Sequence, residues 1–360
     1  MKNALENLRA QVMFNCHVSD AKYGGVFSLC GFLLRMRDYY KWEKNLNPWD
    51  EPDYSELLAW VEDREKLWET TSREEFRSIE LNGHSFDPFD VEAINAAISP
   101  HSLLYGAGYA TGMKPTFFLA TVKSLQRVKR MDIHILDREL ARDIFTSPAM
   151  RQGRHIITRP WAMAALIWDL ILEQKPSTAE VLKYSLADFD LDLDRLLHSP
   201  ALLAKDLWRL SRHESETWVY HELGEALQKE FQLELWQEII ASYSNTVVEK
   251  AARAVKDILA DTHEQGLLAH IITQRKIGSL GFYLCLIPPM SRAIFPEIST
   301  AFERIRTAKD WNFLEEARHR GYQRARVMAA KLTGYHLEGR TRGPDWVRSR
   351  VETELINPLG

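Results

Sequence analysis

The chain has 360 residues, of which 45% are hydrophobic and 27% charged, with a formal net charge of −4 and a pI of about 6.3. This length favours two domains, and the composition is that of an ordinary globular protein. The mildly acidic balance gives no basis for nucleic-acid binding. Acids outnumber bases from Glu43 to Glu92, and bases outnumber acids from Arg304 to Arg350. The 11 Trp residues favour a large core or aromatic-lined clefts.

Cysteine usage and hydropathy indicate the compartment. The chain has three cysteines, Cys16, Cys30 and Cys285. Because their number is odd and they form no Cys-x-x-Cys motif, we expect reduced thiols. The N-terminal residues lack the apolar segment of a secretory signal. The longest nearly apolar run, 161–172, contains Asp169 and is too short to span a membrane. The sequence therefore predicts a soluble, cytoplasmic protein without a membrane partner.

The first part of the chain reads mainly as helices. We predict a short helix over 1–14, a polar turn over 15–20, and, after Gly24-Gly25, a long helix through Phe27 and Cys30 towards Lys44. Cys16 and His17 lie in this turn and could act as nucleophile and base, although adjacent side chains rarely point at one another. Breaks at 47–52 precede expected helices over 55–69 and 72–79, and a loop over 82–90 precedes another helix.

A glycine-rich segment, 105–112, raises the question of nucleotide binding. The dinucleotide fingerprint requires a preceding strand and the spacing Gly-x-Gly-x-x-Gly. Here Gly106 and Gly108 are followed by Gly112, one position late. A flexible loop or close helix packing is therefore the preferred interpretation.

The middle of the chain supplies the β candidates. A helix is expected over 115–130, followed by alternating or β-rich segments at 131–136 and 155–158 with a short helix, 138–145, between them. The fold class is therefore mainly α, multi-helix and two-domain, with at most a small β hairpin or ribbon around residues 131–158. A buried helix is expected from Pro160 to Glu173. The Lys175-Pro176 break then divides an N-terminal domain, 1–175, from a C-terminal domain, 176–360.

The segment 211–231 concentrates more chemically capable side chains than any other. Its apolar spacing predicts a helix, on which His221 and Glu225 form an i, i+4 pair with Glu222 at the edge of the same face. The pattern His-Glu-x-x-Glu could present metal ligands. Asp261 and His263, at the end of a later helix, could complete the site. A zinc-protease signature would require histidine where Glu225 stands.

The alternative is that this face only packs or is solvated. It lies roughly opposite the apolar stripe of the helix, and a His–Glu pair supports a helix without any metal. Trp218 in the middle of the polar face favours contact with another element over exposure to water.

The remainder of the chain is also expected to be helical. Helices are predicted over 233–243, 247–259, 298–309 and 311–332, while 279–287 fits helix or strand, and the tail from Gly334 is expected to be irregular before a last short helix. Glu316 and His319 form a single Glu-x-x-His, whereas a two-metal bundle needs two copies.

Two function classes stay open from these patterns. The first is a protein-binding or assembly component that uses charged or aromatic faces. The second is a metal-dependent enzyme that uses the His-Glu-x-x-Glu helix, with a divalent metal held by His221, Glu222, Glu225, Asp261 and His263.

Overall fold

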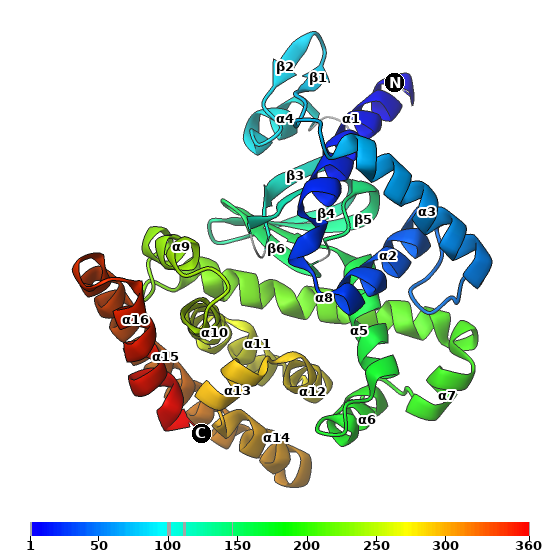
Figure 1. Cartoon of the computed structure of the whole chain (residues 1–360). Coiled ribbons are helices and arrows are strands. Elements are labelled where there is room, and N and C mark those ends of the chain that lie inside the picture. The colour runs from blue at the N-terminus through cyan, green and yellow to red at the C-terminus, as the bar shows by residue number, and fades with distance from the viewer. Residues whose placement is uncertain (1, 99–101, 111–112, 146, 360) are drawn as a thin grey trace. The chain divides into compact units, whose positions relative to one another are not determined.

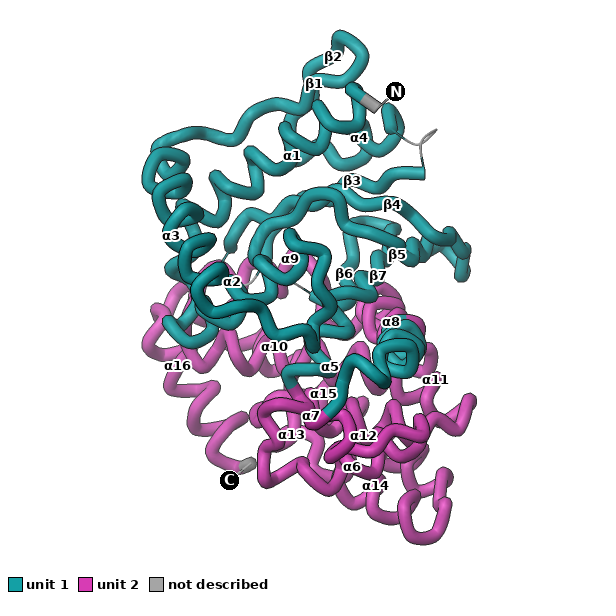
Figure 2. Tube along the Cα trace, turned by 90° about the vertical axis from the view of Figure 1, so that its right-hand side faces the viewer, with its two compact units in different colours: residues 1–169, 199–215 teal, residues 170–198, 216–360 magenta. Residues whose placement is uncertain are grey.

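The computed structural model of the chain describes residues 2–98, 102–110, 113–145 and 147–359. These residues form two compact units, one made of residues 1–169 and 199–215 and the other of residues 170–198 and 216–360 (Figure 2). Two helices, α5 (Pro160–Glu173) and α8 (Ala204–Leu227), contribute residues to both units. We call the two parts unit 1 and unit 2.

Unit 1 combines helices with a mixed sheet (Figure 1). Its helices are α1 (Lys2–Tyr23), the 3-10 turn η1 (Gly24–Val26), α2 (Leu29–Glu43), α3 (Tyr54–Thr71) and α4 (Val91–Ile98). A small antiparallel hairpin pairs β1 (Ile79–Leu81) with β2 (His84–Phe86). The larger sheet contains β3 (Leu103–Tyr109), β4 (Pro115–Val128), β5 (Met131–Arg142), β6 (Ala149–Gln152) and β7 (His155–Thr158).

The five strands follow the order β3-β4-β5-β7-β6. All neighbours are antiparallel except β5 and β7, which run parallel with Asp132 opposite His155. Helix α1 covers one face of the sheet by placing Leu8, Val12 and Cys16 at helical spacing against residues of β3, β4 and β5. Phe118 and Ala120 of β4 belong to a second buried cluster.

The extent of the sheet corrects the sequence prediction. The chain is mainly helical as expected, but its β structure is larger than a hairpin around 131–158. Segment 115–130, expected to be a helix, contains the whole of β4, and 138–142 continues β5 in place of a short helix. No helix forms over 72–78, and the glycine-rich 103–109 is β3. Residues 111–112 of that glycine-rich segment lie outside the described residues.

The physical reason is burial on both faces of the strands. The first six residues of β4, from Pro115 to Ala120, are all buried, so the strand lacks the alternation that reveals a half-exposed strand. In β5, Glu139 and Arg142 lie in the segment expected to form a short helix, and both charged side chains are buried in the strand.

Unit 2 is helical throughout its described residues. Besides its parts of α5 and α8, it contains α6 (Ala179–Ala187), α7 (Leu193–His198), α9 (Leu233–Ser242), α10 (Val247–Thr262), α11 (Leu267–Gln274), α12 (Ile277–Leu286), α13 (Pro289–Ile294), α14 (Glu297–Ala308), α15 (Trp311–Arg342) and α16 (Pro344–Val351). Segment 279–287, which the sequence left undecided, lies almost wholly in α12. Helix α15 runs on to Arg342, so the tail from Gly334 is helical and not irregular as expected.

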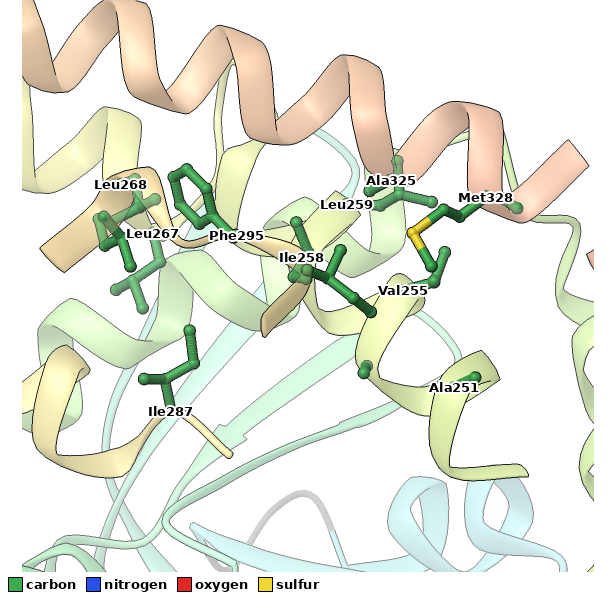
Figure 3. Packing of buried hydrophobic residues seen from close by; sticks show 14 of the residues in the cluster. Ala251, Val255, Ile258, Leu259, Leu267, Leu268, Ile287, Phe295, Ala325 and Met328 are labelled. Carbon is green, nitrogen blue, oxygen red and sulfur yellow. The ribbon is translucent and has the colours of Figure 1, made fainter. Parts of the chain in front are cut away.

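The core of unit 2 forms around α10. Val255, Ile258 and Leu259 of this helix lie in one cluster with Phe295 and Met328 (Figure 3). Most residues of α10 are buried, polar ones included. No helix among the described residues is long and apolar enough to cross a membrane.

Candidate functional site

The predicted metal ligands of α8 pack against α10 within unit 2. His221 donates from Nδ1 to Oδ1 of Asp261 over 2.7 Å. One turn further along α8, Glu225 pairs with Nζ of Lys256 over 2.9 Å. Later residues of α8 pair with earlier residues of α10, so the two helices run antiparallel here. We call these two ion pairs the α8–α10 seam.

Electrostatics fix the charge state of the seam. Burial alone lowers the pKa of His221, but the charge and hydrogen bond of Asp261 outweigh it and raise the pKa to about 10. His221 is therefore an imidazolium at neutral pH. Burial raises the pKa of the nearby Asp257 to about 6 against the opposing effect of His221. A protonated imidazole has no lone pair for a metal, so any metal would have to displace this proton.

A glycine sets the separation of the two helices. A Cβ atom on Gly224 would lie 2.1 Å from the backbone oxygen of Ala260. Only glycine allows this approach, which brings the charged side chains of the seam within hydrogen-bonding distance. Trp218, on the same face of α8, is partly buried and packs against the core of unit 2. Its ring centroid lies 6.1 Å from that of His221.

The other two predicted ligands occupy different environments. Glu222 is buried, and its charge contributes to the raised pKa of His221. His263 follows the last residue of α10 and accepts a hydrogen bond at Nδ1 from the backbone N–H of Gln265. Among the described residues, no group of three or more His, Cys, Asp or Glu side chains is arranged to hold a metal ion. The five-residue metal site stays a prediction.

A pocket that the sequence did not reveal lies in unit 1. It has a volume of about 540 Å³ and collects side chains from α1, the segment after α2, β5, and the starts of α5 and α8. Its lining includes Trp42, Trp161, Trp208, Arg9, Arg138, Arg159, Glu6, Glu43, Asp137, Glu139, Asn45 and Asn47. We call it the Trp–Arg pocket.

Hydrogen bonds hold the three tryptophans of this pocket. The indole N–H of Trp42 donates to the backbone oxygen of Glu139 over 3.3 Å. Trp161 donates to the backbone oxygen of Leu46 over 3.4 Å, and Trp208 to the side-chain oxygen of Asn47 over 3.1 Å. Because their only polar groups are engaged, these side chains form a pre-organised aromatic wall.

A buried arginine that lines the pocket shares its ion-pair partner with a second buried arginine. Arg159 lines the pocket, and its Nε donates to Glu139, whose second carboxylate oxygen lies 3.5 Å from Nη1 of Arg142. The guanidinium of Arg142 lies 5.0 Å from the ring centroid of Trp161 and 5.5 Å from that of Trp42. All three charged side chains are at least nine-tenths buried. We call Arg142, Arg159 and Glu139 the arginine cluster.

This cluster has more donors than acceptors. Within the described part of the chain, Nη1 and Nη2 of Arg142 and Nη2 of Arg159 are buried without a hydrogen-bond partner. Two guanidinium groups share the single carboxylate of Glu139, with Asp38 acting on Arg142 through its charge only. Burial lowers the pKa of Arg142, but an arginine still stays protonated in proteins. These buried cationic donors lack an acceptor among the described residues, and an anion that reached them would supply one.

The remaining sequence candidates are packed or solvated. Cys16 is buried, and burial raises the pKa of its thiol, which makes it a poor nucleophile. The ring of His17 contacts Arg64, and burial, followed by the charge of Arg64, lowers its pKa to about 3. His319 is exposed and pairs with Glu315 over 3.0 Å.

Together, fold and pocket define a two-domain, mainly helical protein with a five-stranded mixed sheet and a tryptophan-walled pocket over buried arginines. Residues 7–159 match the N-terminal domain, and residues 164–354 the C-terminal domain, of a family of unknown function (DUF6866). The chain therefore belongs to this family. Comparisons with curated proteins and with solved structures gave no match. The function must accordingly be argued from the residues.

Proposed function

We propose that unit 1 binds a small molecule with a carboxylate or phosphate group on a flat, apolar body, and that the Trp–Arg pocket holds it. The observation that carries this proposal is the cationic excess of the arginine cluster. An anionic group at the floor of the pocket would accept hydrogen bonds from Arg159 and balance the second guanidinium. The tryptophan wall would pack against the body of the ligand.

The acidic side chains of the pocket narrow the class of ligand. Asp137 and Glu6 are exposed near the opening, while Glu43 is engaged by Arg64 and Trp60. Carboxylates at the rim repel a ligand that carries several negative charges. The pocket therefore suits a small monoanion better than a polyphosphate or a nucleic-acid strand.

Three matched aromatic probes test the proposal on the full chain: benzoate, phenyl phosphate and benzylamine. We expect benzoate or phenyl phosphate to quench tryptophan fluorescence saturably and raise the thermal midpoint, and benzylamine to do neither. Arg159→Met should abolish the effect, whereas Arg348→Met, at an exposed arginine of unit 2, should preserve it. Equal responses to benzylamine and benzoate would refute anion selectivity.

A protein-assembly role is our second proposal, and the exposed face of α2 supports it. Leu29 and Leu33 are 74% and 52% exposed and lie one turn apart, with Val26 and Leu34 exposed beside them. Residues 24–34 contain no charge, so burying this face desolvates no ion. We expect a second copy of the chain to cover it.

Sedimentation velocity over a range of concentrations tests this assembly. Leu29→Glu should shift the chain towards monomer, and Leu202→Glu, at a leucine 76% exposed on another segment, should not. A natural chain that is monomeric at all concentrations would contradict the proposal.

The metal-dependent enzyme remains the alternative for unit 2. The closeness of His221 to Asp261 and Glu222 supports it, while the raised pKa of His221 opposes it. Metal analysis of the purified chain decides whether this region binds a metal or is only a packed ion pair. Stoichiometric metal that survives dialysis and disappears in His221→Ala would favour the enzyme, and its absence would remove the support for a metal site.

A further inference from the structure

Two histidines of unit 1 face each other at a place outside the lining of the Trp–Arg pocket. His134 lies on β5 and His155 on the parallel strand β7. His155 stands opposite Asp132 of β5, and Asp132 precedes His134 by two residues. Because residues two apart on a strand point to the same face, the imidazoles of His134 and His155 lie on the same face of the sheet. Nε2 of His134 and Nδ1 of His155 are 3.0 Å apart, with ring centroids separated by 5.1 Å.

The pair opens into a hollow of its own. Both histidines line a cavity of about 790 Å³ whose walls come from α4, β3 and β4. Asp132, the nearest carboxylate along β5, is already engaged by Arg127 over 2.8 Å and by Arg154 over 3.2 Å. Glu92 of α4 lines the same cavity, and its negative charge acts on His155. The cavity has room for water or a small ligand beside the imidazoles.

The separation of the two nitrogens, now set by their hydrogen bond, is compatible with one kind of coordination geometry. Two nitrogen ligands at about 2.0–2.1 Å from a metal and at right angles to each other lie about 3 Å apart. Adjacent ligands at right angles are typical of tetragonal sites, which Cu²⁺ and Ni²⁺ prefer with nitrogen and oxygen ligands. We propose that His134 and His155 form a two-histidine site for a divalent transition metal of the Cu²⁺ or Ni²⁺ type, open towards the cavity.

Binding replaces the hydrogen bond between the rings. The proton held between Nε2 of His134 and Nδ1 of His155 moves to another nitrogen or to solvent, and the rings tilt so that their lone pairs converge on the ion. The remaining positions take water or an external ligand, because the described residues contain no third side chain in place. Glu92 lines the same cavity and is the acidic candidate to approach the ion, through water or directly, because Asp132 is engaged by two arginines.

Titration of the full, metal-free chain with Cu²⁺ alone tests the site. Electron paramagnetic resonance should show a tetragonal ion with two equatorial imidazole nitrogens. His134→Gln and His155→Gln should each weaken the strongest site by about tenfold or more, since even the loss of an outer-shell partner of a metal ligand costs that much. His84→Gln, at an exposed histidine of β2, serves as the matched control and should leave the affinity unchanged.

A second measurement keeps the test independent of how the variants fold. Cu²⁺ should protect His134 and His155 of the natural chain from acylation by diethyl pyrocarbonate, as mapped by peptide mass spectrometry, and Mg²⁺ should not. Unchanged affinity in both variants, or acylation of both histidines at the same rate with and without Cu²⁺, would overturn the proposal. Neither result bears on the Trp–Arg pocket, which none of these residues lines.

Discussion

The two units each bury a group of charged side chains, but the two groups are balanced differently. In unit 2, the α8–α10 seam pairs each cation directly with a carboxylate, His221 with Asp261 and Lys256 with Glu225, and the charges of Glu222 and Asp257 also act on His221. In unit 1, Arg142 and Arg159 share Glu139, and three of their guanidinium nitrogens have no hydrogen-bond partner among the described residues. Both groups are largely removed from water, so burial does not distinguish them.

The balance of charge does distinguish them. A buried ion pair whose partners satisfy each other holds two helices in register and leaves little free energy for a ligand. A buried cation with unused donors carries a desolvation cost that an incoming anion can offset. We therefore assign the seam to structure and the arginine cluster to binding, although the sequence pointed to α8 as the chemical centre.

Removing one partner of the seam should have the largest effect. Asp261→Ala leaves His221 buried without its counter-charge, and we expect the free energy of unfolding to fall by about 3–5 kcal/mol. Urea unfolding at pH 7 measures this loss. Replacing both residues by leucine should restore much of it, because no charge is then buried alone. If Asp261→Ala were as stable as the natural chain, the ion pair between His221 and Asp261 would not contribute to the stability of the fold.

The seam should also make stability depend on pH in the alkaline range. The pKa of His221 is raised from 6.5 to about 10 in the folded chain. Its stabilising effect is therefore complete below pH 6.5 and lost as the pH rises towards 10. We expect the urea midpoint to fall over this interval more steeply in the natural chain than in His221→Gln. Parallel pH profiles of the two proteins would contradict the ion pair.

Widening the seam should cost less than removing a charge. Gly224→Ala places a methyl group against the backbone oxygen of Ala260 and pushes α8 away from α10. We expect a loss of about 1–3 kcal/mol, typical of overpacking. Gly334→Ala is the matched control, because nothing lies within 4 Å of a Cβ atom at this helical position. Equal stability of the two variants would argue against close packing at Gly224.

The smallest effect on stability is expected in the arginine cluster. Arg159→Met removes the excess cation and leaves Glu139 paired with Arg142, so no charge becomes isolated. We expect the free energy of unfolding to change by about 1 kcal/mol or less in either direction. A loss as large as that in Asp261→Ala would place Arg159 among the structural residues and weaken the binding proposal.

Local patterns in the sequence were sufficient for the helices but not for the sheet. The helix over 55–69 corresponds to α3 and that over 160–173 to α5, because spacing and caps decide such segments. Strand β4 was misassigned because both faces of its first half are buried, which removes the period-two signal. The boundary near Pro176 stays a prediction, which limited proteolysis between 173 and 178 can test.

The pocket could not be predicted because its residues are distant in sequence. Trp42, Trp161 and Trp208 converge only after β5 and α5 are in place. The one signal available was the high number of tryptophans, which favoured an aromatic-lined cleft without locating it. The sequence named Asp261 only as a possible further ligand of a metal beside His221, and the ion pair between the two residues depends on a burial that residue types alone do not give.

Calorimetric titration of benzoate into two opposite variants tests the central claim most directly. Removing the competing carboxylate in Glu139→Gln should tighten binding relative to the natural chain, and removing the donor in Arg159→Met should abolish it. The two substitutions lie in the same ion pair, so general damage to the pocket would weaken binding in both. Opposite changes in affinity are the predicted result, and a loss of binding in Glu139→Gln would contradict an anion site at the arginine cluster.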